Sequence, residues 1–289
     1  MTSDAANSLS IWNVPALLSS LQPELTSAAI AAVEAKLGIG LPAALVAVLQ
    51  EQNGGYLRRT LPDTGHRMIW GIGPRGNSIG DNYWWELLDH PGDWYPADGW
   101  LPQNPRRLVP FDSDGHWYLC LDYRNGGDRE PRITWFDLDE QEERAVAKNM
   151  PAFLTMLTAQ DETKLGWVIT ESLAECAARL DGIFEHPSEP RESDDLYGYP
   201  FFRWFREDGW VQLAPNRVKR GFISRQDEAT YQELKDLLPG EALRFPEHPQ
   251  AAMIIHCGNQ AMTDSVQAAL TQEGFDVRRL QAPSDPAEA

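Results

Sequence analysis

Two short motifs in the sequence have the spacing of ligand-binding loops. Asp112-Ser113-Asp114-Gly115 begins like a calcium loop, in which alternating acids supply oxygen ligands. The next ligand step holds no Asp or Asn, and the twelfth position holds no Glu, so we expect a tight turn rather than a metal site. Residues 71–76 have the G-x-G-x-x-G spacing of a dinucleotide loop. Pro74 removes a backbone donor and no convincing apolar helix follows, so we expect no nucleotide there.

The histidines and cysteines do not form a recognisable catalytic or metal-binding pattern. No HExxH, G-x-S-x-G or P-loop motif is present, and the three cysteines form no CxxC pair. His256 and Cys257 end an apolar segment, but no partner acid or base is evident, so we expect a buried structural role for His256. We therefore predict no cofactor and no enzymatic activity. An enzyme using His256 and clustered acids in the C-terminal half stays open as an alternative.

An aromatic and acidic stretch between Asp81 and Trp100 is the strongest candidate for contacting another protein. Aromatic side chains are enriched at binding hot spots, and the interleaved acids could meet Lys or Arg on a partner. The alternative is that these rings fill the core of a sheet, which we favour for at least half of them. Together with two acids of the 112–115 turn, the candidate partner-binding residues are Trp84, Trp85, Glu86, Asp93, Trp94, Tyr95, Asp112 and Asp114.

A second candidate surface is the loop from Glu185 to Asp195, which holds five acids. We favour a solvated loop over an interface, because runs of like charge are commonly solvated.

The N-terminal part of the sequence predicts a helical hairpin. Residues 26–38 have helical apolar spacing, with Thr26 or Ser27 as a cap and Gly38 as a C-terminal stop. A second helix opens at Leu41-Pro42 and ends at Asn53-Gly54-Gly55, where residues that tolerate positive φ turn the chain.

Residues 56–137 alternate short apolar segments with turn residues, which predicts a meandering antiparallel sheet. The expected strands are 68–72, 108–111, 117–122 and 133–136, and a closing helix is expected over 145–157. Two helices, a sheet and a closing helix make an α+β domain, which we place at residues 1–160.

Residues 161–282 predict a second, smaller α/β domain. We expect helices over 171–184, 227–238 and 259–273, a hairpin of strands 201–205 and 210–213, and strands over 251–257 and 275–280. The last β-α-β unit could pair its two strands in parallel. The small polar tail, 283–289, is predicted to be disordered.

Composition narrows the class of partner. The 289 residues carry 25 Lys and Arg against 43 Asp and Glu, a net charge of −18. Such a field repels nucleic acid and anionic membranes and attracts basic partners, although solubility alone would also explain it. The three separated cysteines, the lack of a long apolar run and the polar first ten residues predict a cytoplasmic protein.

The spacing of the predicted hairpin carries a family resemblance. The residues Glu34, Gly38, Leu41, Pro42, Asn53, Gly54 and Gly55 form a pattern that resembles the opening of the SUKH superfamily, the Smi/Knr type of immunity domain. Later features follow in order at residues 108–111, 118–122 and 150–154, so the resemblance covers roughly residues 20–158. The Trp-rich insertion around 81–100 departs from the shortest members of this family.

The resemblance implies binding rather than catalysis. It implies an immunity protein that neutralises a toxin domain, often a nuclease, delivered by a competing cell. By charge, the toxin would be basic. Some similar proteins are regulatory or scaffold proteins without a toxin partner, and that alternative stays open, as does the oligomeric state.

Overall fold

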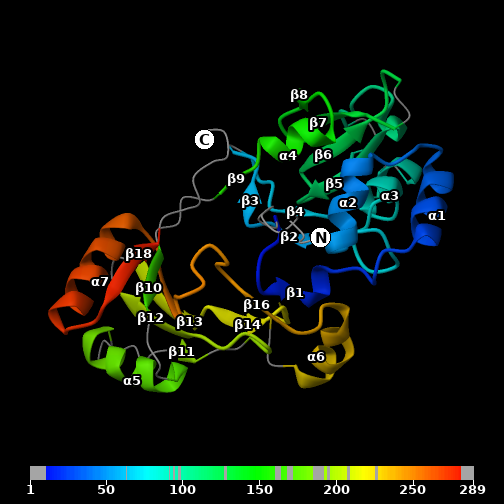
Figure 1. The fold of residues 1–289 in the computed structure, drawn as a ribbon. Coiled ribbons are helices and arrows are strands. Elements are labelled where there is room, and N and C mark those ends of the chain that lie inside the picture. Colours follow the sequence, from blue (N-terminus) through cyan, green and yellow to red (C-terminus); the bar gives the residue numbers. More distant parts are fainter. Residues whose placement is uncertain are drawn as a thin grey trace, which may run out of the picture. The chain divides into compact units, whose positions relative to one another are not determined.

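The computed structural model divides the chain into two compact units (Figure 1). The first unit is Ser19–Thr158, and the second combines Met1–Leu18 with Ala159–Ala289. The structure describes residues 11–62, 64–90, 92–93, 95–96, 99–126, 129–159, 164–167, 172–184, 192–193, 196–206, 209–224 and 227–280.

The sequence analysis placed residues 1–160 in one domain. The structure instead assigns Met1–Leu18 to the second unit. Strand β1 (Ala16–Leu17) pairs in parallel with β15 (Gly221–Phe222), and the Ala16 amide donates to the Arg220 carbonyl at 2.8 Å. These pairings place residues 11–18 with the second unit rather than the first. The first unit is therefore an insertion between residues 18 and 159 of the second.

The first unit opens with the predicted helical hairpin. Helix α1 (Ser27–Leu37) begins at Thr26, whose side chain accepts from the Ala29 amide at 3.1 Å, and ends at Gly38, where φ is 63°. Helix α2 (Ala43–Glu51) begins one residue later than predicted, because Pro42 occupies the N-cap position. Both predicted helices are thus confirmed to within a residue or two.

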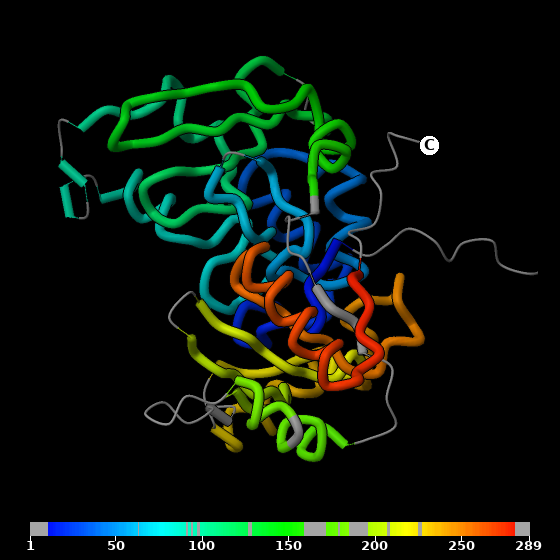
Figure 2. Tube along the Cα trace, turned by 90° about the vertical axis from the view of Figure 1, so that its left-hand side faces the viewer, coloured from blue at the N-terminus to red at the C-terminus, as the bar shows by residue number. Residues whose placement is uncertain are grey.

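Four antiparallel strands follow in a meander, β5-β6-β7-β8, as the sequence analysis predicted for this region (Figure 2). Strands β5 (Leu108–Ser113), β6 (Trp117–Asp122) and β7 (Arg132–Asp137) correspond to three predicted strands. The predicted strand 68–72 is shorter: only β4 (Met68–Ile69) is a strand, and it pairs with β2 (Gly55–Tyr56). The remaining short elements of this region are η1 (Leu18–Ser20), β3 (Arg59–Thr60), η2 (Pro105–Arg107) and β9 (Thr158–Ala159).

The predicted closing helix over 145–157 was wrong at its start. Residues Glu142–Ala147 form β8, whose side chains are mostly exposed, and so lack the apolar alternation of a half-buried strand. Helix α4 (Met150–Thr155) begins only after Asn149, whose side chain accepts from the Ala152 amide at 3.0 Å. An Asn cap followed by Pro151 in the first turn is the start signal that we missed.

The four-stranded sheet buries both of its faces. On one face Phe111 packs against Phe153 of α4, with ring centroids 5.5 Å apart. On the other face Tyr118 and Cys120 join a core that includes Trp84 of α3 (Tyr83–Asp89). Helix α3 was not predicted; the aromatic insertion forms it and covers this second face.

The second unit is built on a six-stranded sheet of order β11-β12-β13-β17-β10-β18, in which all neighbours are antiparallel. The predicted hairpin is confirmed, with Phe205 opposite Trp210. The predicted direct pairing of the last two strands was wrong, because β10, which the sequence analysis missed, lies between them. The strands are β10 (Lys164–Trp167), β11 (Glu192–Ser193), β12 (Phe202–Arg206), β13 (Gly209–Pro215), β17 (Met253–Cys257) and β18 (Val277–Leu280).

This sheet contains two interleaved split β-α-β units. The first runs β10-α5-β13 with β17 between its strands, and the second runs β17-α7-β18 with β10 between its strands. This is the ferredoxin-like arrangement with an added edge at β11 and β12. Helices α5 (Leu173–Phe184) and α7 (Gln260–Gln272) bury side chains in one core with the sheet, so both cover the same face (Figure 1).

A long connection joins β13 to β17. It holds β14 (Arg217–Lys219), β15, α6 (Glu228–Leu234), η3 (Lys235–Leu237) and β16 (Glu241–Leu243). Buried Asn216 holds the end of this connection next to its start. The Asn216 side chain accepts from the Phe245 amide at 2.9 Å and donates to the His248 carbonyl at 3.0 Å. Among the described residues no helix is both long and apolar enough to cross a membrane.

Candidate partner-binding surface

The Asn53-Gly54-Gly55 motif joins two loops through a buried amide. The Asn53 side chain accepts from the Ile72 amide at 2.8 Å and donates to the Ile72 carbonyl at 2.9 Å. Gly54 has φ 95°, and a Cβ there would lie 2.6 Å from the Gly71 nitrogen. The motif therefore needs glycine for a close approach of two backbones.

The same contacts explain the G-x-G-x-x-G spacing of residues 71–76. The Ile72 amide donates to Asn53, and the Arg75 amide donates to the Gln22 side chain at 2.9 Å. Two of the backbone donors that a phosphate would need are thus used within the protein. The glycine at position 71 allows the close approach to Asn53.

The other family residues fix the turn between α1 and α2. The Glu34 carboxylate accepts from the Leu41 amide at 2.8 Å, and the Glu34 carbonyl accepts from the Ile39 amide at 3.2 Å. The Tyr123 hydroxyl donates to the Gly40 carbonyl at 2.8 Å. Glu34 and its neighbours therefore stabilise the fold.

The structure separates the aromatic candidates into core and surface. Trp84 has no exposed surface; its indole donates to the Leu108 carbonyl at 3.2 Å, and its ring lies 4.9 Å from Tyr118. Trp84 is thus a core residue and offers nothing for a partner to contact. Trp85 is half-buried, Glu86 and Asp93 are exposed, and Trp94 lies outside the described residues. The acidic loop 185–195 also lies outside them except for residues 192–193, as does the tail 283–289.

Asp112 is buried as well, at 2 % exposure. Its carboxylate accepts from the amides of Arg67 at 3.1 Å and Met68 at 3.4 Å, and burial raises its pKa to about 7. The His66 Nε2 atom lies 4.0 Å away, and burial lowers the pKa of His66 to about 4. Asp112 therefore fastens β4 to β5 instead of reaching a partner.

One end of the four-stranded sheet gathers three acids, of which Asp114 and Asp139 are exposed and Asp137 is half-buried. The exposed His116 ring bonds to Asp139 at 2.7 Å, which ties the β5–β6 turn to the β7–β8 turn. The pKa of His116 is raised by this bond, and the negative charges of Asp114 and Asp137 add to the effect. Tyr95 lies beside them, since its hydroxyl donates to the Leu138 carbonyl at 3.1 Å. We call this group the acidic end: Tyr95, Asp114, His116, Asp137 and Asp139.

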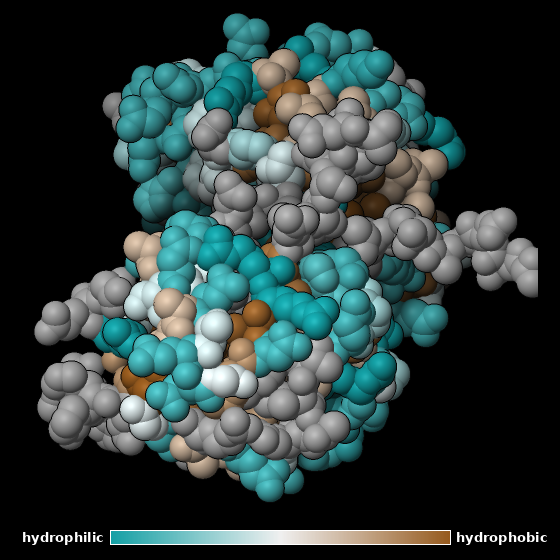
Figure 3. Space-filling view, turned by 60° about the vertical axis from the view of Figure 1, so that its left-hand side comes forward, coloured by the Kyte–Doolittle hydropathy of each residue, from teal (hydrophilic) through white to brown (hydrophobic). Residues whose placement is uncertain are grey.

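The sequence analysis found Tyr95 and Asp114 but missed the other three members. Asp137 and Asp139 border the β7–β8 turn. The sequence analysis could not predict this turn because it did not predict β8. The signal that could have found them is the acidic run 137–143 between two strands. On the face seen in Figure 3, hydrophilic residues predominate among the coloured ones, and hydrophobic residues form separate areas between them.

A buried charge network supports the sheet near its other end. Burial alone would raise the pKa of Asp122, but hydrogen bonds from Arg124, Arg132 and Thr134 hold it well below its usual range. Arg124 also pairs with Glu143, so this carboxylate is not free to meet a partner. A guanidinium shared by two carboxylates fixes β8 to the loop after β6.

The described residues hold no group of three or more His, Cys, Asp or Glu side chains that could bind a metal ion. All three cysteines are buried, and burial raises the pKa of Cys120 well above its usual value.

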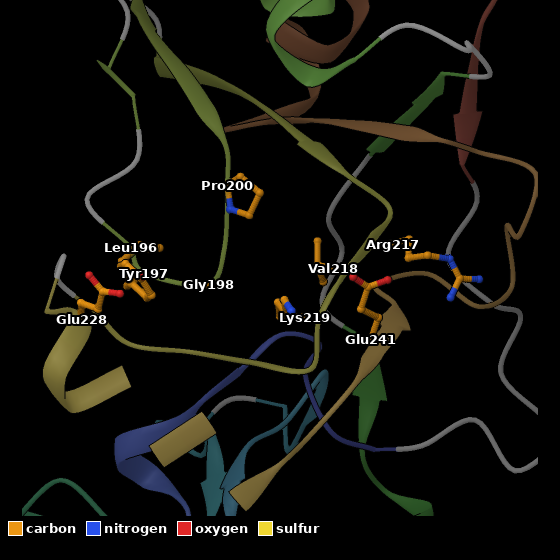
Figure 4. A pocket seen from close by; sticks show the side chains of 9 residues that line it. All are labelled: Leu196, Tyr197, Gly198, Pro200, Arg217, Val218, Lys219, Glu228 and Glu241. Carbon is orange, nitrogen blue, oxygen red and sulfur yellow. The ribbon is translucent and has the colours of Figure 1, made fainter. Parts of the chain in front are cut away.

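A pocket of about 680 Å³ lies in the second unit (Figure 4). Its lining carries two cations and two carboxylates, and Lys219 and Glu241 are directly opposite each other on β14 and β16. This mixed lining suits a polar ligand without favouring either charge. The lining residues are Leu196, Tyr197, Gly198, Pro200, Arg217, Val218, Lys219, Glu228 and Glu241.

Comparison with known proteins assigns the first unit. Residues 24–156 match the SMI1 / KNR4 family (SUKH-1), which confirms the resemblance carried by the hairpin motif. The matched range is a little under half of the chain and lies within Ser19–Thr158. The family includes immunity proteins. A comparison of the chain with curated proteins finds no match.

Proposed function

We propose that this chain, whose residues 24–156 form a SUKH domain, is an immunity protein that binds and neutralises a toxin domain. SUKH domains are associated with toxin partners and are generally not enzymes. The toxin is basic, and a nuclease would fit because nucleases bind an anionic substrate. The protein acts in the cytoplasm, whose reducing conditions suit three buried cysteines that form no disulfide.

The acidic end is the observation that carries this proposal. Three carboxylates, Asp114, Asp137 and Asp139, surround one histidine, and Tyr95 adds an aromatic ring. Opposite charge speeds encounter with a basic surface, by about 10- to 1,000-fold in strong cases. A bound SUKH domain would then block the toxin's active site or substrate groove sterically.

The test is affinity capture with the tagged full chain from its own cells, at low and at high salt. We expect a stoichiometric basic protein that carries a toxin domain, with capture weakened by salt. The double variant D114N/D139N keeps a side-chain acceptor for the His116 amide but removes two charges from the acidic end. We expect it to weaken capture by roughly 10-fold or more, mainly through a slower association rate.

The matched control is E24Q/E51Q, which removes two exposed carboxylates elsewhere in the same unit. If both double variants lose capture equally, the effect comes from net charge alone, and the acidic end is not the binding surface. Recovery of housekeeping or signalling proteins alone would instead favour a regulatory or scaffold protein.

A further inference from the structure

The pocket in the second unit has charged groups at both ends of its lining (Figure 4). Glu228 lies at one end with Tyr197, and Arg217 lies at the opposite end with Glu241. Lys219 lies between the two ends. These four charged side chains are all exposed, and together they carry no net charge. The lining thus offers charges of both signs at separate places.

The end at Glu228 is held in place by its neighbours. The Tyr197 hydroxyl is hydrogen-bonded to the Glu228 carboxylate. The Tyr197 ring packs against Tyr231 of α6, with centroids 4.6 Å apart, and the Tyr197 carbonyl accepts from the Ile223 amide at 3.0 Å. One hydrogen bond leaves a carboxylate with further acceptor sites, because it has about four. Glu228 is therefore positioned to accept hydrogen bonds from an ammonium group of a ligand.

The opposite end is formed by the antiparallel pair β14 and β16. Lys219 lies directly opposite Glu241, so these two charges balance each other across the pair. Arg217 points to the same side as Lys219, since the two are alternate residues of one strand. Its own cross-strand neighbour is Leu243, so β16 places no carboxylate opposite Arg217. A guanidinium can hold a carboxylate through two parallel hydrogen bonds, so this end suits a carboxylate of a ligand.

We propose that this pocket binds a short peptide in an extended conformation, with the amino terminus at Glu228 and the carboxyl terminus at Arg217. The body of the peptide would lie against Leu196, Pro200 and the ring of Tyr197. A free amino acid has the same two charged groups, but both are attached to one carbon atom, so it cannot reach both ends. The volume of about 680 Å³ also suits the larger ligand, since pockets for drug-sized molecules measure roughly 300–1,000 Å³.

The net charge of −18 does not disfavour such a ligand. A peptide with one ammonium and one carboxylate is neutral overall, so the field of the whole chain neither attracts nor repels it. Ion pairs between exposed groups are weak, and the pocket supplies only exposed charges. We therefore expect a dissociation constant of roughly 0.01–1 mM.

The experiment is isothermal titration calorimetry of the full chain at low salt and pH 7, where both peptide ends are charged. The probe is a pentapeptide of alternating alanine and leucine, with free ends, with an acetylated amino end or with an amidated carboxyl end. We expect saturable binding of the free peptide, and each blocked end should weaken it by about 2- to 5-fold. In E228Q, acetylation should have no further effect. In R217Q, amidation should have no further effect.

The matched control is D236N, which removes an exposed carboxylate just after α6 but outside the pocket lining. It should keep the effects of both blocked ends. Effects that persist in E228Q and R217Q, or the exchanged pattern between the two variants, would overturn the proposal. Absence of saturable binding would overturn it as well.

Titration with free alanine and free leucine separates the two sources of the same charged groups. A pentapeptide that binds at least 5-fold tighter than either amino acid supports the proposal. Equal affinity would overturn it in favour of a single amino acid. D114N/D139N should bind the pentapeptide normally, because the acidic end belongs to the first unit, so failure of the immunity proposal would leave this result unchanged.

Discussion

At the scale of single residues, the buried His66 and Asp112 have opposite effects on the pH dependence of stability. In the unfolded chain their pKa values are the usual 6.5 and 3.8, whereas in the folded protein they are about 4 and about 7. Between about pH 4 and 6.5, the unfolded pair carries its proton on histidine and the folded pair carries it on Asp112. Both states bind one proton, so the pair contributes no pH dependence there.

A variant that removes one of the two groups should reveal the pH dependence of stability that the other group contributes. In D112N, only the unfolded state protonates His66, so stability should rise with pH by up to about 1.4 kcal/mol per unit. In H66N, only the folded state protonates Asp112, so stability should fall with pH by the same slope. Urea unfolding at several pH values between about 4.5 and 6.5 measures both slopes. Because other groups contribute the same background to all three proteins, the slopes are compared with that of the wild type, and changes in the same direction in the two variants would contradict the assignment.

At the scale of elements, helix α3 shows which elements could not be predicted from sequence patterns. Caps at Thr26 and Gly38 and the buried strand β6 were readable because each is a local signal. Helix α3 has seven residues, too few to establish a helical period, and β10 has four. Exposed β8 lacks apolar alternation. The acidic end could not be predicted because it needs two hairpin turns to meet, and only tertiary pairing shows that.

Because α3 covers one face of the four-stranded sheet, its two tryptophans should differ in a measurable way. W84A empties a site that is fully buried between Tyr118 and Phe136, so it should destabilise the first unit by about 3–5 kcal/mol. W85A removes a half-buried ring and should cost less than about 2 kcal/mol. Chemical unfolding of the full chain checks this order. Equal costs would mean that α3 does not bury Trp84 as described.

At the scale of the whole molecule, the first unit, which contains the match to the SMI1 / KNR4 family, is an insertion between residues 18 and 159 of the second unit. Residues 11–18 complete the second unit, where Leu18 is fully buried against Gly221. A chain cut at residue 159 would therefore separate the second unit from its own first strand. Each unit has its own cores, so damage at the Leu18–Gly221 contact should stay within the second unit.

The pair L18A and G221A tests this organisation. A Cβ at Gly221 would collide with the Leu18 side chain, so G221A should cost about 1–3 kcal/mol by overpacking. L18A should cost about 2–5 kcal/mol by leaving a cavity. Since L18A makes room for the added methyl group, the double variant should cost less than the sum. Native-state hydrogen exchange should show faster exchange at β14 and β15 and unchanged exchange at β5, β6 and β7. Additive costs, or faster exchange in the four-stranded sheet, would show that the two units do not divide at residue 18.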